Sequence, residues 1–363
     1  MIPEAVRKAF KVAQTEKPGA IHLVLPEDVA AKELPEGDAL TPLGVQAPFI
    51  PEPTTGQVKR AMAVLQDAKR PIILAGNGVA RRHAEEAVRR CARTLQIPVV
   101  HTFMGKGIMP DSDPLSLFAV GLQIRDYAAQ VLEEADVVIA VGYDFVEYAP
   151  SFWNPQRDKR VIHVDEFPAE VDAHYHVAVG VLGDVGQALD RITEGVNPFE
   201  AEWATHSRKT VFTGLEEEQA AKATWPLRPQ HIIRDLRTAL APEDIVVCDV
   251  GAHKLWMARM FPCHAPSTCI ISNGFASMGI ALPGAVAAQL LFPSRRVVAV
   301  TGDGGFLMNS QEMETVVRLQ LPIVILIWRD NGYGVIRWKQ MMQFGRTSSV
   351  EFSNPDFVTY AQA

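Results

Sequence analysis

The sequence predicts an α/β protein built from doubly wound, mostly parallel sheets. Short apolar runs such as Val137–Val141 and Val297–Val300 have the composition of buried parallel strands. Helical patterns separate these runs, and glycine-rich turns follow them at Gly76 and Gly302. A length of 363 residues exceeds one ordinary core and suits two domains with part of a third.

Composition and charge indicate an ordinary globular protein. The net charge of −7 gives no reason to expect a nucleic-acid partner. No apolar run approaches the roughly 20 residues that a membrane helix needs, and Met1 leads into a charged segment rather than a signal peptide. We therefore expect no membrane partner and a cytoplasmic location. Buried free thiols are expected at the four cysteines, Cys91, Cys248, Cys263 and Cys269.

The first segment resembles the end of a domain. Residues Pro3–Thr15 predict a helix and Ala20–Leu25 predict a strand, which together cannot bury a core. Five prolines lie between Leu34 and Pro53, as is typical of a linker. We therefore expect a domain remnant over residues 1–33 and a linker over residues 34–56.

Residues 57–195 predict a central α/β domain. It should begin with a helix at Gln57–Gln66 and a strand at Pro71–Leu74, followed by a Gly76-Asn77-Gly78 turn into a helix at Arg81–Leu95. A Gly-x-Gly turn after a strand is a weak nucleotide-binding signal, and Arg81 stands where a third glycine would belong. Later elements are expected at Val99–Val100, Tyr127–Glu134, Val137–Val141 and Val161–Val164.

A polar connector and a last domain should follow. The charged stretch Glu200–Thr224 predicts a solvated helix within a connector over residues 196–226. The last domain, residues 227–363, should contain helices and strands at His231–Leu240, Ile245–Val250, Thr268–Ile271 and Ile280–Leu291.

A strand–helix–strand unit organises this last domain. The run Val297–Val300 ends at a glycine-rich turn, and Asn309 with Glu312 has the spacing of a helix cap and its capping-box partner. A helix from Asn309 to about Gln320 and a second buried strand at Ile323–Trp328 are therefore expected.

An acidic residue follows each strand of this unit. Because ligands of open parallel sheets bind beyond the carboxyl ends of the strands, Asp303 and Asp330 should converge there. With no Lys or Arg partner in the pattern, the two carboxylates would repel unless a cation such as Mg²⁺ lies between them. The glycines after Asp303 could offer backbone N–H groups to a phosphate. The alternative from spacing alone is a pair of ordinary acidic turn residues.

The turn after Ile245–Val250 should lie on the same rim. Gly251 allows a close approach of a ligand, and His253 could donate to a phosphate oxygen. A histidine after a glycine turn is, however, more often a helix cap or a surface residue.

The motifs of this domain resemble those of thiamine diphosphate enzymes. Gly302-Asp303-Gly304 followed some two dozen residues later by Asp330-Asn331 is similar to the family's cofactor motif. The stretches SNGFASMGIALPGAVAAQL and NGYGVIRWKQ resemble the acetolactate synthase large subunit in particular. Arg329 departs from the pattern, since the family often has Asn at that position.

The resemblance implies a fold of the thiamine diphosphate-binding type with a central spacer domain. It implies that Mg²⁺ is held by Asp303, Asp330 and the carbonyl of Gly332. It also implies that Met278 wedges between the two cofactor rings, and that the backbone carbonyl of Ala276 accepts a hydrogen bond where the family usually has Gly. The implied cofactor contacts are Gly251, Ala252, His253, Ala276, Ser277, Met278, Gly302, Asp303, Gly304, Gly305, Asp330, Gly332 and Tyr333.

The resemblance also covers the start of the chain. AFKVAQTEKPGAIHLVLPEDV is similar to the close of the family's pyrimidine-binding domain, so we expect most of that domain, with its activating glutamate, to be absent. No catalytic residue is then assigned, and the last domain should be incomplete at its C-terminus. In the family that glutamate comes from a second subunit, which implies a homodimer, a tetramer or a separate chain as partner. FAD is not expected, because the stretch from Gly142 to Tyr148 is more similar to the flavin-independent type.

The expected function is that of a thiamine diphosphate- and Mg²⁺-dependent acetolactate synthase-like enzyme, as in branched-chain amino acid biosynthesis. Such enzymes decarboxylate pyruvate and join the product to a second 2-keto acid. We expect this chain to be inactive alone. Two alternatives stay open: a non-catalytic cofactor-binding remnant, and a related decarboxylase of 2-keto acids or acyl-CoA.

Overall fold

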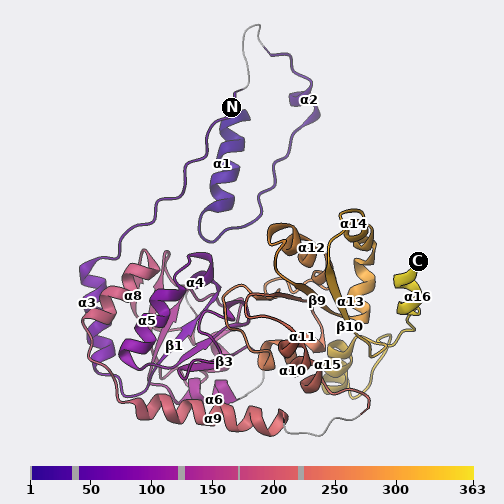
Figure 1. The fold of residues 1–363 in the computed structure, drawn as a ribbon. Helices are drawn as coiled ribbons and strands as arrows, with labels where there is room; N and C mark the ends of the chain where they lie inside the picture. The colour runs from indigo at the N-terminus through magenta and orange to yellow at the C-terminus, as the bar shows by residue number, and fades with distance from the viewer. Residues whose placement is uncertain (1, 35–40, 122–126, 171, 220–224) are drawn as a thin grey trace. The chain divides into compact units, whose positions relative to one another are not determined.

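The computed structural model describes residues 2–34, 41–121, 127–170, 172–219 and 225–363 (Figure 1). The chain divides into two compact units, Met1–Glu52 and Pro53–Ala363. Among the described residues, no helix is both long enough and apolar enough to cross a bilayer.

The first unit contains helix α1 (Ile2–Gln14) and the single turn α2 (Glu27–Ala30). The strand predicted at Ala20–Leu25 is wrong, since these residues have no regular structure and are all exposed. A strand is stable only when a neighbour satisfies its backbone groups, and the described residues offer this segment no paired strand.

The second unit opens with a six-stranded sheet in the order β3-β2-β1-β4-β5-β6, and every pairing in it is parallel. Its strands are β1 (Pro71–Ala75), β2 (Val99–His101), β3 (Ser116–Ala119), β4 (Val137–Val141), β5 (Arg160–Asp165) and β6 (Val177–Leu182). The chain moves outward from β1 in both directions, which is the doubly wound arrangement predicted from sequence. Strands β3 and β6 were not among the predicted elements.

Helices cover both faces of this sheet (Figure 1). They are α3 (Thr55–Gln66), α4 (Asn77–Arg81), α5 (Glu85–Leu95), the 3₁₀ turn η1 (Phe103–Gly105), α6 (Tyr127–Glu134), α7 (Pro150–Trp153), α8 (Val185–Glu194) and α9 (Ala201–Gln219). Alternate residues of β1 divide between the two faces: Ile73 packs in the cluster with α3, α5 and α8, whereas Leu74 packs in the cluster with α6 and α9.

Two predictions for this region need correction. Gly76-Asn77-Gly78 is not a free turn, because Asn77 and Gly78 form the first turn of α4. The helix expected from Arg81 to Leu95 is interrupted at His83, whose φ of 52° is left-handed and therefore incompatible with a continuous helix.

Helix α9 is also less solvated than its composition predicts. Ala204, Val211 and Leu215 are buried on one side of it. The guanidinium of Arg208 donates to the carbonyls of Ser116 and Asp111 and lies over the Phe212 ring. A long cationic side chain can cover apolar surface in this way, so a charged sequence still makes a packed helix.

The last part of the chain forms a four-stranded, all-parallel sheet in the order β10-β9-β7-β8. Its strands are β7 (Ile245–Cys248), β8 (Cys269–Ile271), β9 (Val297–Gly302) and β10 (Ile323–Trp328). The helices are α10 (Pro229–Ala239), α11 (Ala252–Met260), α12 (Ala281–Leu291), α13 (Asp303–Met308), η2 (Ser310–Glu312), α14 (Met313–Arg318), α15 (Gly334–Phe344) and α16 (Phe357–Gln362). Two all-parallel sheets confirm the predicted fold class.

The helix expected to start at Asn309 starts earlier. Helix α13 begins directly at Asp303, and Asn309 separates it from η2 without a capping hydrogen bond from its side chain. The amide of Asn309 instead donates to the carbonyl of Gly279, 2.8 Å away. A long-range hydrogen bond has therefore taken the side chain that the local pattern assigned to a cap.

Strand β10 is not the buried strand that its composition predicts. It lies at one edge of the sheet, and within the described parts of the chain only β9 pairs with it. Val324 on this strand is 58% exposed. An apolar run alone cannot distinguish a central strand from an edge strand.

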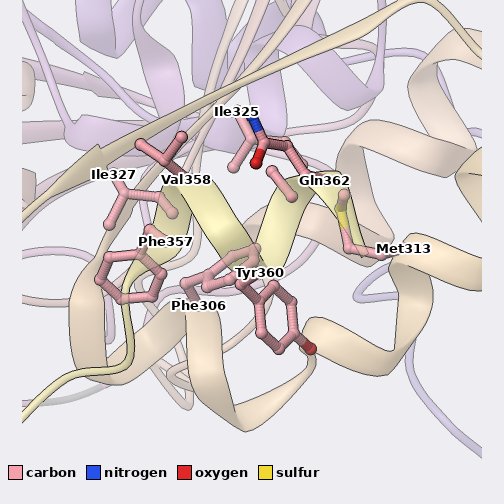
Figure 2. A pocket seen from close by; sticks show the side chains of 9 residues that line it. Phe306, Met313, Ile325, Ile327, Phe357, Val358, Tyr360 and Gln362 are labelled. Carbon is pink, nitrogen blue, oxygen red and sulfur yellow. The ribbon is translucent and has the colours of Figure 1, made fainter.

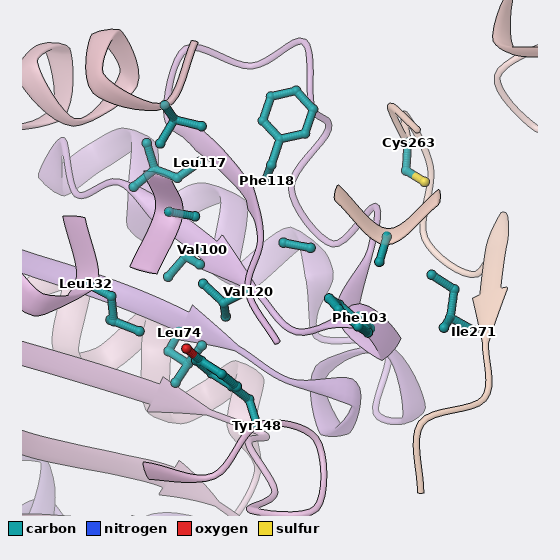
Figure 3. Packing of buried hydrophobic residues seen from close by; sticks show 14 of the residues in the cluster. Leu74, Val100, Phe103, Leu117, Phe118, Val120, Leu132, Tyr148, Cys263 and Ile271 are labelled. Atoms are coloured by element: carbon teal, nitrogen blue, oxygen red, sulfur yellow. The ribbon is translucent and has the colours of Figure 1, made fainter. Parts of the chain in front are cut away.

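One apolar cluster joins the two sheets. It includes Leu74, Val100 and Phe103 beside the first sheet, and Cys263 and Ile271 beside the second (Figure 3). All four cysteines are buried and free, as predicted.

A buried polar network accompanies this cluster. Asp111 accepts hydrogen bonds from Ser116 Oγ (3.0 Å) and from the backbone N–H of Cys263 (2.8 Å), and His101 Nε2 lies 3.3 Å from it. Lys106 donates to the carbonyl of Ala258, 3.0 Å away. Burial alone would raise the pKa of Asp111, but the charge of Lys106 and the hydrogen bonds from His101 and the N–H of Cys263 outweigh burial and lower it.

Candidate cofactor and metal site

The carboxyl ends of four parallel strands form one rim of the second sheet. Residue 248 ends β7, 271 ends β8, 302 ends β9 and 328 ends β10. Gly302 ends β9, and the other predicted site residues follow a strand end within seven residues, which brings chain segments more than 70 residues apart to one edge.

Asp303 is the first residue of α13 and is only 2% exposed. Its Oδ2 atom accepts hydrogen bonds from the backbone N–H groups of Asp330 (3.3 Å) and Asn331 (2.7 Å), so it holds the turn after β10. Its Oδ1 atom accepts one hydrogen bond, from Gly304 N at 2.9 Å. Among the described residues, no Lys or Arg forms an ion pair with this buried carboxylate.

Asp330 lies on the same turn and is half exposed. Burial, together with the negative charge of Asp303, raises its pKa. The expectation that this pair has no cationic partner is wrong in one respect: Arg337 Nη2 lies 3.6 Å from Asp330 Oδ2. Both side chains are largely open to solvent, so the contact compensates the charge only weakly.

Gly304 and Gly305 are buried in the first turn of α13. A Cβ on Gly304 would stand 2.9 Å from the ring of Tyr333, and a Cβ on Gly305 would stand 2.8 Å from a carboxylate oxygen of Asp249. Neither position has room for a side chain. Glycine is therefore required at both positions by the close approach of Tyr333 and Asp249.

Gly332 and Tyr333 complete the turn after β10. Gly332 forms an isolated bridge with Glu351, and Tyr333 N donates to the carbonyl of Val350 at 2.8 Å. The carbonyl of Gly332 accepts from Gly334 N at 3.2 Å, which leaves one lone pair of that oxygen for another partner.

His253 lies in the first turn of α11, after Gly251 and Ala252. Its ring is close to two glycines, because a Cβ on Gly251 or on Gly302 would stand 2.8 Å or 3.4 Å from it. Burial lowers the pKa of His253 to about 4, so the ring is neutral at pH 7. Its Nε2 atom is buried and has no hydrogen-bond partner in the described structure.

Asp249 is a central residue of the rim that the sequence patterns did not single out. Its carboxylate accepts from Gly279 N at 2.8 and 3.0 Å and from Thr301 Oγ1 at 3.0 Å. The same rule that located Asp303, an acid at the end of a parallel strand, could have located it. Because Asp249 is only 1% exposed, its carboxylate bonds to neighbouring parts of the chain.

Ala276, Ser277 and Met278 are connected to this rim through Gly279, whose φ is +85°. Ala276 itself has a φ of 50°, a left-handed conformation that costs a non-glycine residue about 1 kcal/mol. Glycine, which is usual at this position in the family, adopts this conformation without that cost. The sequence argument considered only the hydrogen bond of the backbone carbonyl and did not include this reason. Ser277 is exposed and Met278 is partly buried.

Lys254 and Asn273 connect this segment to the loop that follows β4. Lys254 Nζ donates to the carbonyl of Ser272 (3.0 Å) and to Asn273 Oδ1 (2.7 Å), and Asn273 Nδ2 donates to the carbonyl of Glu147 at 2.8 Å. Asn273, just before the predicted cofactor residues Ala276–Met278, is thus hydrogen-bonded both to α11 and to the loop after β4.

The glycines at Gly76 and Gly78 are explained without a nucleotide. A Cβ on either residue would stand less than 3 Å from the backbone of Gly142, so the close approach is to the protein itself. The N–H of Asn77 donates to the buried carboxylate of Glu147 at 3.1 Å, and Thr102 donates to the same carboxylate. The carboxyl group of Glu147 therefore occupies the helix start where a phosphate would bind.

A cavity in this part of the chain is lined by none of the rim carboxylates. Its volume is about 420 Å³, and in Figure 2 residues of α16 lie against β10 and α13 around it. Its wall includes Phe306, Ile325, Ile327, Phe357 and Tyr360. Such an apolar wall offers nothing to a charged diphosphate.

The residues at the rim fit a divalent cation with a phosphate group. Asp303 and Asp330 are hard oxygen donors with excess negative charge, and the carbonyl of Gly332 is a third donor of the same type. The Nε2 atom of His253 is buried without a hydrogen-bond partner in the described structure. Buried polar atoms of native proteins are nearly always hydrogen-bonded, so a bound ligand would explain this one.

Two family models match this chain, one in the region of each of its two sheets. The family model described as "Thiamine pyrophosphate enzyme, central domain" matches residues 58–192. The model described as "Thiamine pyrophosphate enzyme, C-terminal TPP binding domain" matches residues 249–363.

Three curated relatives align with the whole of this chain. It is 35% identical to an acetolactate synthase of Bacillus subtilis and 32% identical to a probable acetolactate synthase large subunit of Methanocaldococcus jannaschii, and it spans 64% of the length of each. It is 31% identical to a catabolic acetolactate synthase of Raoultella terrigena and spans 65% of its length.

Proposed function

The chain belongs to the thiamine pyrophosphate enzymes, and from this premise we propose that it binds thiamine diphosphate with Mg²⁺ and serves an acetolactate synthase-like reaction. The observation that carries the proposal is the convergence of Asp303 and Asp330 beside the glycine backbone of α13. Two carboxylates at the carboxyl rim of a parallel sheet are a suitable pair for a hard cation that bridges to a diphosphate.

In this proposal Asp303, Asp330 and the carbonyl of Gly332 hold Mg²⁺. The backbone of Gly251, Ala252, Gly302, Gly304 and Gly305 faces the diphosphate. His253 binds as a neutral imidazole, with Nε2 in its protonated tautomer donating to a phosphate oxygen, because the low pKa excludes imidazolium at pH 7. Ala276, Ser277, Met278 and Tyr333 belong to the same cofactor site by position in the sequence motifs.

The proposed substrate class is a 2-keto acid, with pyruvate as the first candidate because the relatives are acetolactate synthases. Thiamine diphosphate, when bound, supplies the electron sink that decarboxylation of a 2-keto acid requires. The chain's own residues bind and orient that cofactor. A related 2-keto acid or acyl-CoA decarboxylase is the alternative within the same chemistry.

We also propose that the central α/β region, which we place at residues 57–195, is a spacer that binds no FAD. The supporting observation is that its glycine turn contacts Gly142 and that the adjacent N–H of Asn77 is bonded to Glu147. The corresponding proposal for residues 227–363 is that they form the cofactor domain, with residues 196–226 as connector.

The activating glutamate of the family matches no residue of this sequence. We therefore propose that activity requires a pyrimidine-binding domain carried by another polypeptide, in an assembly that can also contain two or four copies of this chain. Without it, the chain should bind cofactor but produce little or no acetolactate. Robust production by the 363-residue chain alone would overturn this part of the proposal.

The direct test is calorimetric titration of thiamine diphosphate into the chain with Mg²⁺. We expect Asp303→Ala to weaken binding at least tenfold, because removal of a hydrogen-bonded carboxylate from a cation site leaves about 1.4 kcal/mol or more uncompensated. Asp235→Ala is the matched control, since Asp235 is an exposed acid whose partner is its neighbour Arg234. Equal binding by both variants would contradict the proposed site.

A further inference from the structure

The segment from Val350 to Asn354 lies along the turn that follows β10. Tyr333 N donates to the carbonyl of Val350 at 2.8 Å, and Phe352 N donates to the carbonyl of Asn331 at 3.2 Å. Gly332 and Glu351 form an antiparallel bridge between these contacts. The turn that contains Asp330 is therefore paired to a later part of the chain.

The side chain of Asn354 crosses from this segment to Asp303. Its Nδ2 group donates to Asp303 Oδ2 at 2.7 Å and to Asn331 Oδ1 at 2.8 Å. One amide group thus joins the carboxylate at the end of β9 to the turn at the end of β10. Both donor hydrogens of the amide are used.

The hydrogen bonds at Asp303 are unequal between its two oxygens. Oδ2 accepts three, from Asp330 N, Asn331 N and Asn354 Nδ2, whereas Oδ1 accepts one, from Gly304 N. A carboxylate has about four lone-pair sites in total. The oxygen with remaining capacity for a cation is therefore Oδ1.

We propose that Asn354 is a positioning residue of the metal site, which occupies Asp303 Oδ2 and so directs the cation to Oδ1. The proposal rests on the proposed function, because it concerns the same Mg²⁺ site. Asn354 is not a ligand in this account. It fixes the orientation of the ligand carboxylate and the distance between the two turns, in the way that partners of ligands tune metal sites in other proteins.

A second observation supports this assignment. The Oδ1 atom of Asn354 is buried and accepts no hydrogen bond in the described structure. A water molecule in the coordination shell of Mg²⁺ is a donor of the kind that such an acceptor requires, since Mg²⁺ keeps several waters when it binds to proteins.

The first experiment separates metal affinity from cofactor affinity in the 363-residue chain. Mg²⁺ is titrated at saturating thiamine diphosphate, and thiamine diphosphate is titrated at saturating Mg²⁺. For Asn354→Ala we expect the apparent Kd of Mg²⁺ to rise about 10- to 100-fold, the range for lost partners of metal ligands, while the Kd of the cofactor changes less than about threefold. Ser353→Ala, at the exposed neighbouring position, should change neither value.

The opposite result is equally clear. Wild-type Mg²⁺ affinity in Asn354→Ala, together with lost affinity in Asp303→Ala, would overturn the positioning role and leave the proposed function intact. A general loss of both affinities would identify a merely structural role.

A second measurement does not depend on cofactor binding. Amide hydrogen exchange in the cofactor-free chain should become about tenfold faster at Asp330 and Asn331 in Asn354→Ala, because both N–H groups donate to the carboxylate that Asn354 holds. Unchanged exchange in Asn354→Ala would overturn the positioning role, whether or not the wild-type chain binds cofactor. A wild-type chain that binds no cofactor would contradict the proposed function, which is a separate result.

Discussion

The site is held together by side chains whose roles no local pattern reveals. Asp303, Asp330 and the adjacent glycines could be found from sequence, because an acid or a glycine after an apolar strand is a short-range signal. The position of Asp249 follows the same rule, but its hydrogen bond to Gly279, 30 residues away, does not. Asn354 has no such signal, because its partner Asp303 lies 51 residues away in the sequence. Only the tertiary structure places such partners together.

The buried environment of Glu147 changes the pKa of its carboxyl group. Burial raises its pKa to about 7, although hydrogen bonds from Thr102 and from the N–H of Asn77 and the charge of Arg81 oppose the rise. Between pH 4.5, the ordinary value, and pH 7 the folded chain keeps a proton that the unfolded chain has released. Stability therefore decreases as the pH rises through this window, by about 3 kcal/mol.

Glu147→Gln should remove this dependence. The amide keeps the shape and has no charge to bury, so the variant should be more stable than the wild type at pH 8 and similar to it at pH 5. The measurement is urea unfolding at the two pH values. Glu314→Gln, in an exposed ion pair with Arg318, is the control, and the same pH dependence in both variants would refute the assignment.

At the scale of elements, the alternation of strand and helix was predictable and several boundaries were not. Strands β4 and β10 have the predicted limits, because β-branched runs bounded by turns leave little ambiguity. The start of α13 at Asp303 was missed because glycine usually disfavours a helix. There the close contacts of Gly304 and Gly305 exclude side chains, so packing overrides propensity.

Strand β10 is an element whose place in the sheet has consequences for solubility. Val324 is exposed on a strand that has one partner in the described structure, and unpaired apolar edges promote pairing between molecules. Val324→Lys should reduce concentration-dependent light scattering and shift Tm by less than about 2 °C, as surface substitutions usually do.

Val317→Lys is the matched control for that experiment. Val317 is 71% exposed on helix α14, so the substitution adds the same charge and removes similar apolar surface away from any strand edge. An equal reduction in scattering by both variants would attribute the effect to net charge alone.

At the scale of the whole molecule, the second unit is held as one body by contacts between its two sheets. The buried cluster of Figure 3 spans both, and Asp111 bonds to the N–H of Cys263 across the junction. Sequence reasoning identified the two α/β parts but could not have predicted their junction, because apolar periodicity gives the buried face of an element and not its partner.

Asp111→Ala should destabilise the second unit by about 3–5 kcal/mol, the range for the removal of one partner from a buried charge network. The loss leaves Lys106 buried without its carboxylate neighbour and the N–H of Cys263 without an acceptor. Urea unfolding followed by tryptophan fluorescence measures it. Asp190→Ala, which breaks a half-exposed pair with Arg90, should cost less than about 1 kcal/mol, and comparable losses would contradict the role of the junction.

The burial of all four thiols provides a built-in reporter of local opening. Cys91 lies in α5 behind the first sheet, whereas Cys248, Cys263 and Cys269 lie in or beside the second. Burial raises the pKa of Cys91 to about 11 and that of Cys248 further, so each sulfur is protonated and shielded in the folded chain. A thiol reagent followed by mass spectrometry would thus time the exposure of each sheet separately. A cysteine introduced on the surface could be labelled with a fluorophore, while the four buried native thiols of the folded chain stay unlabelled.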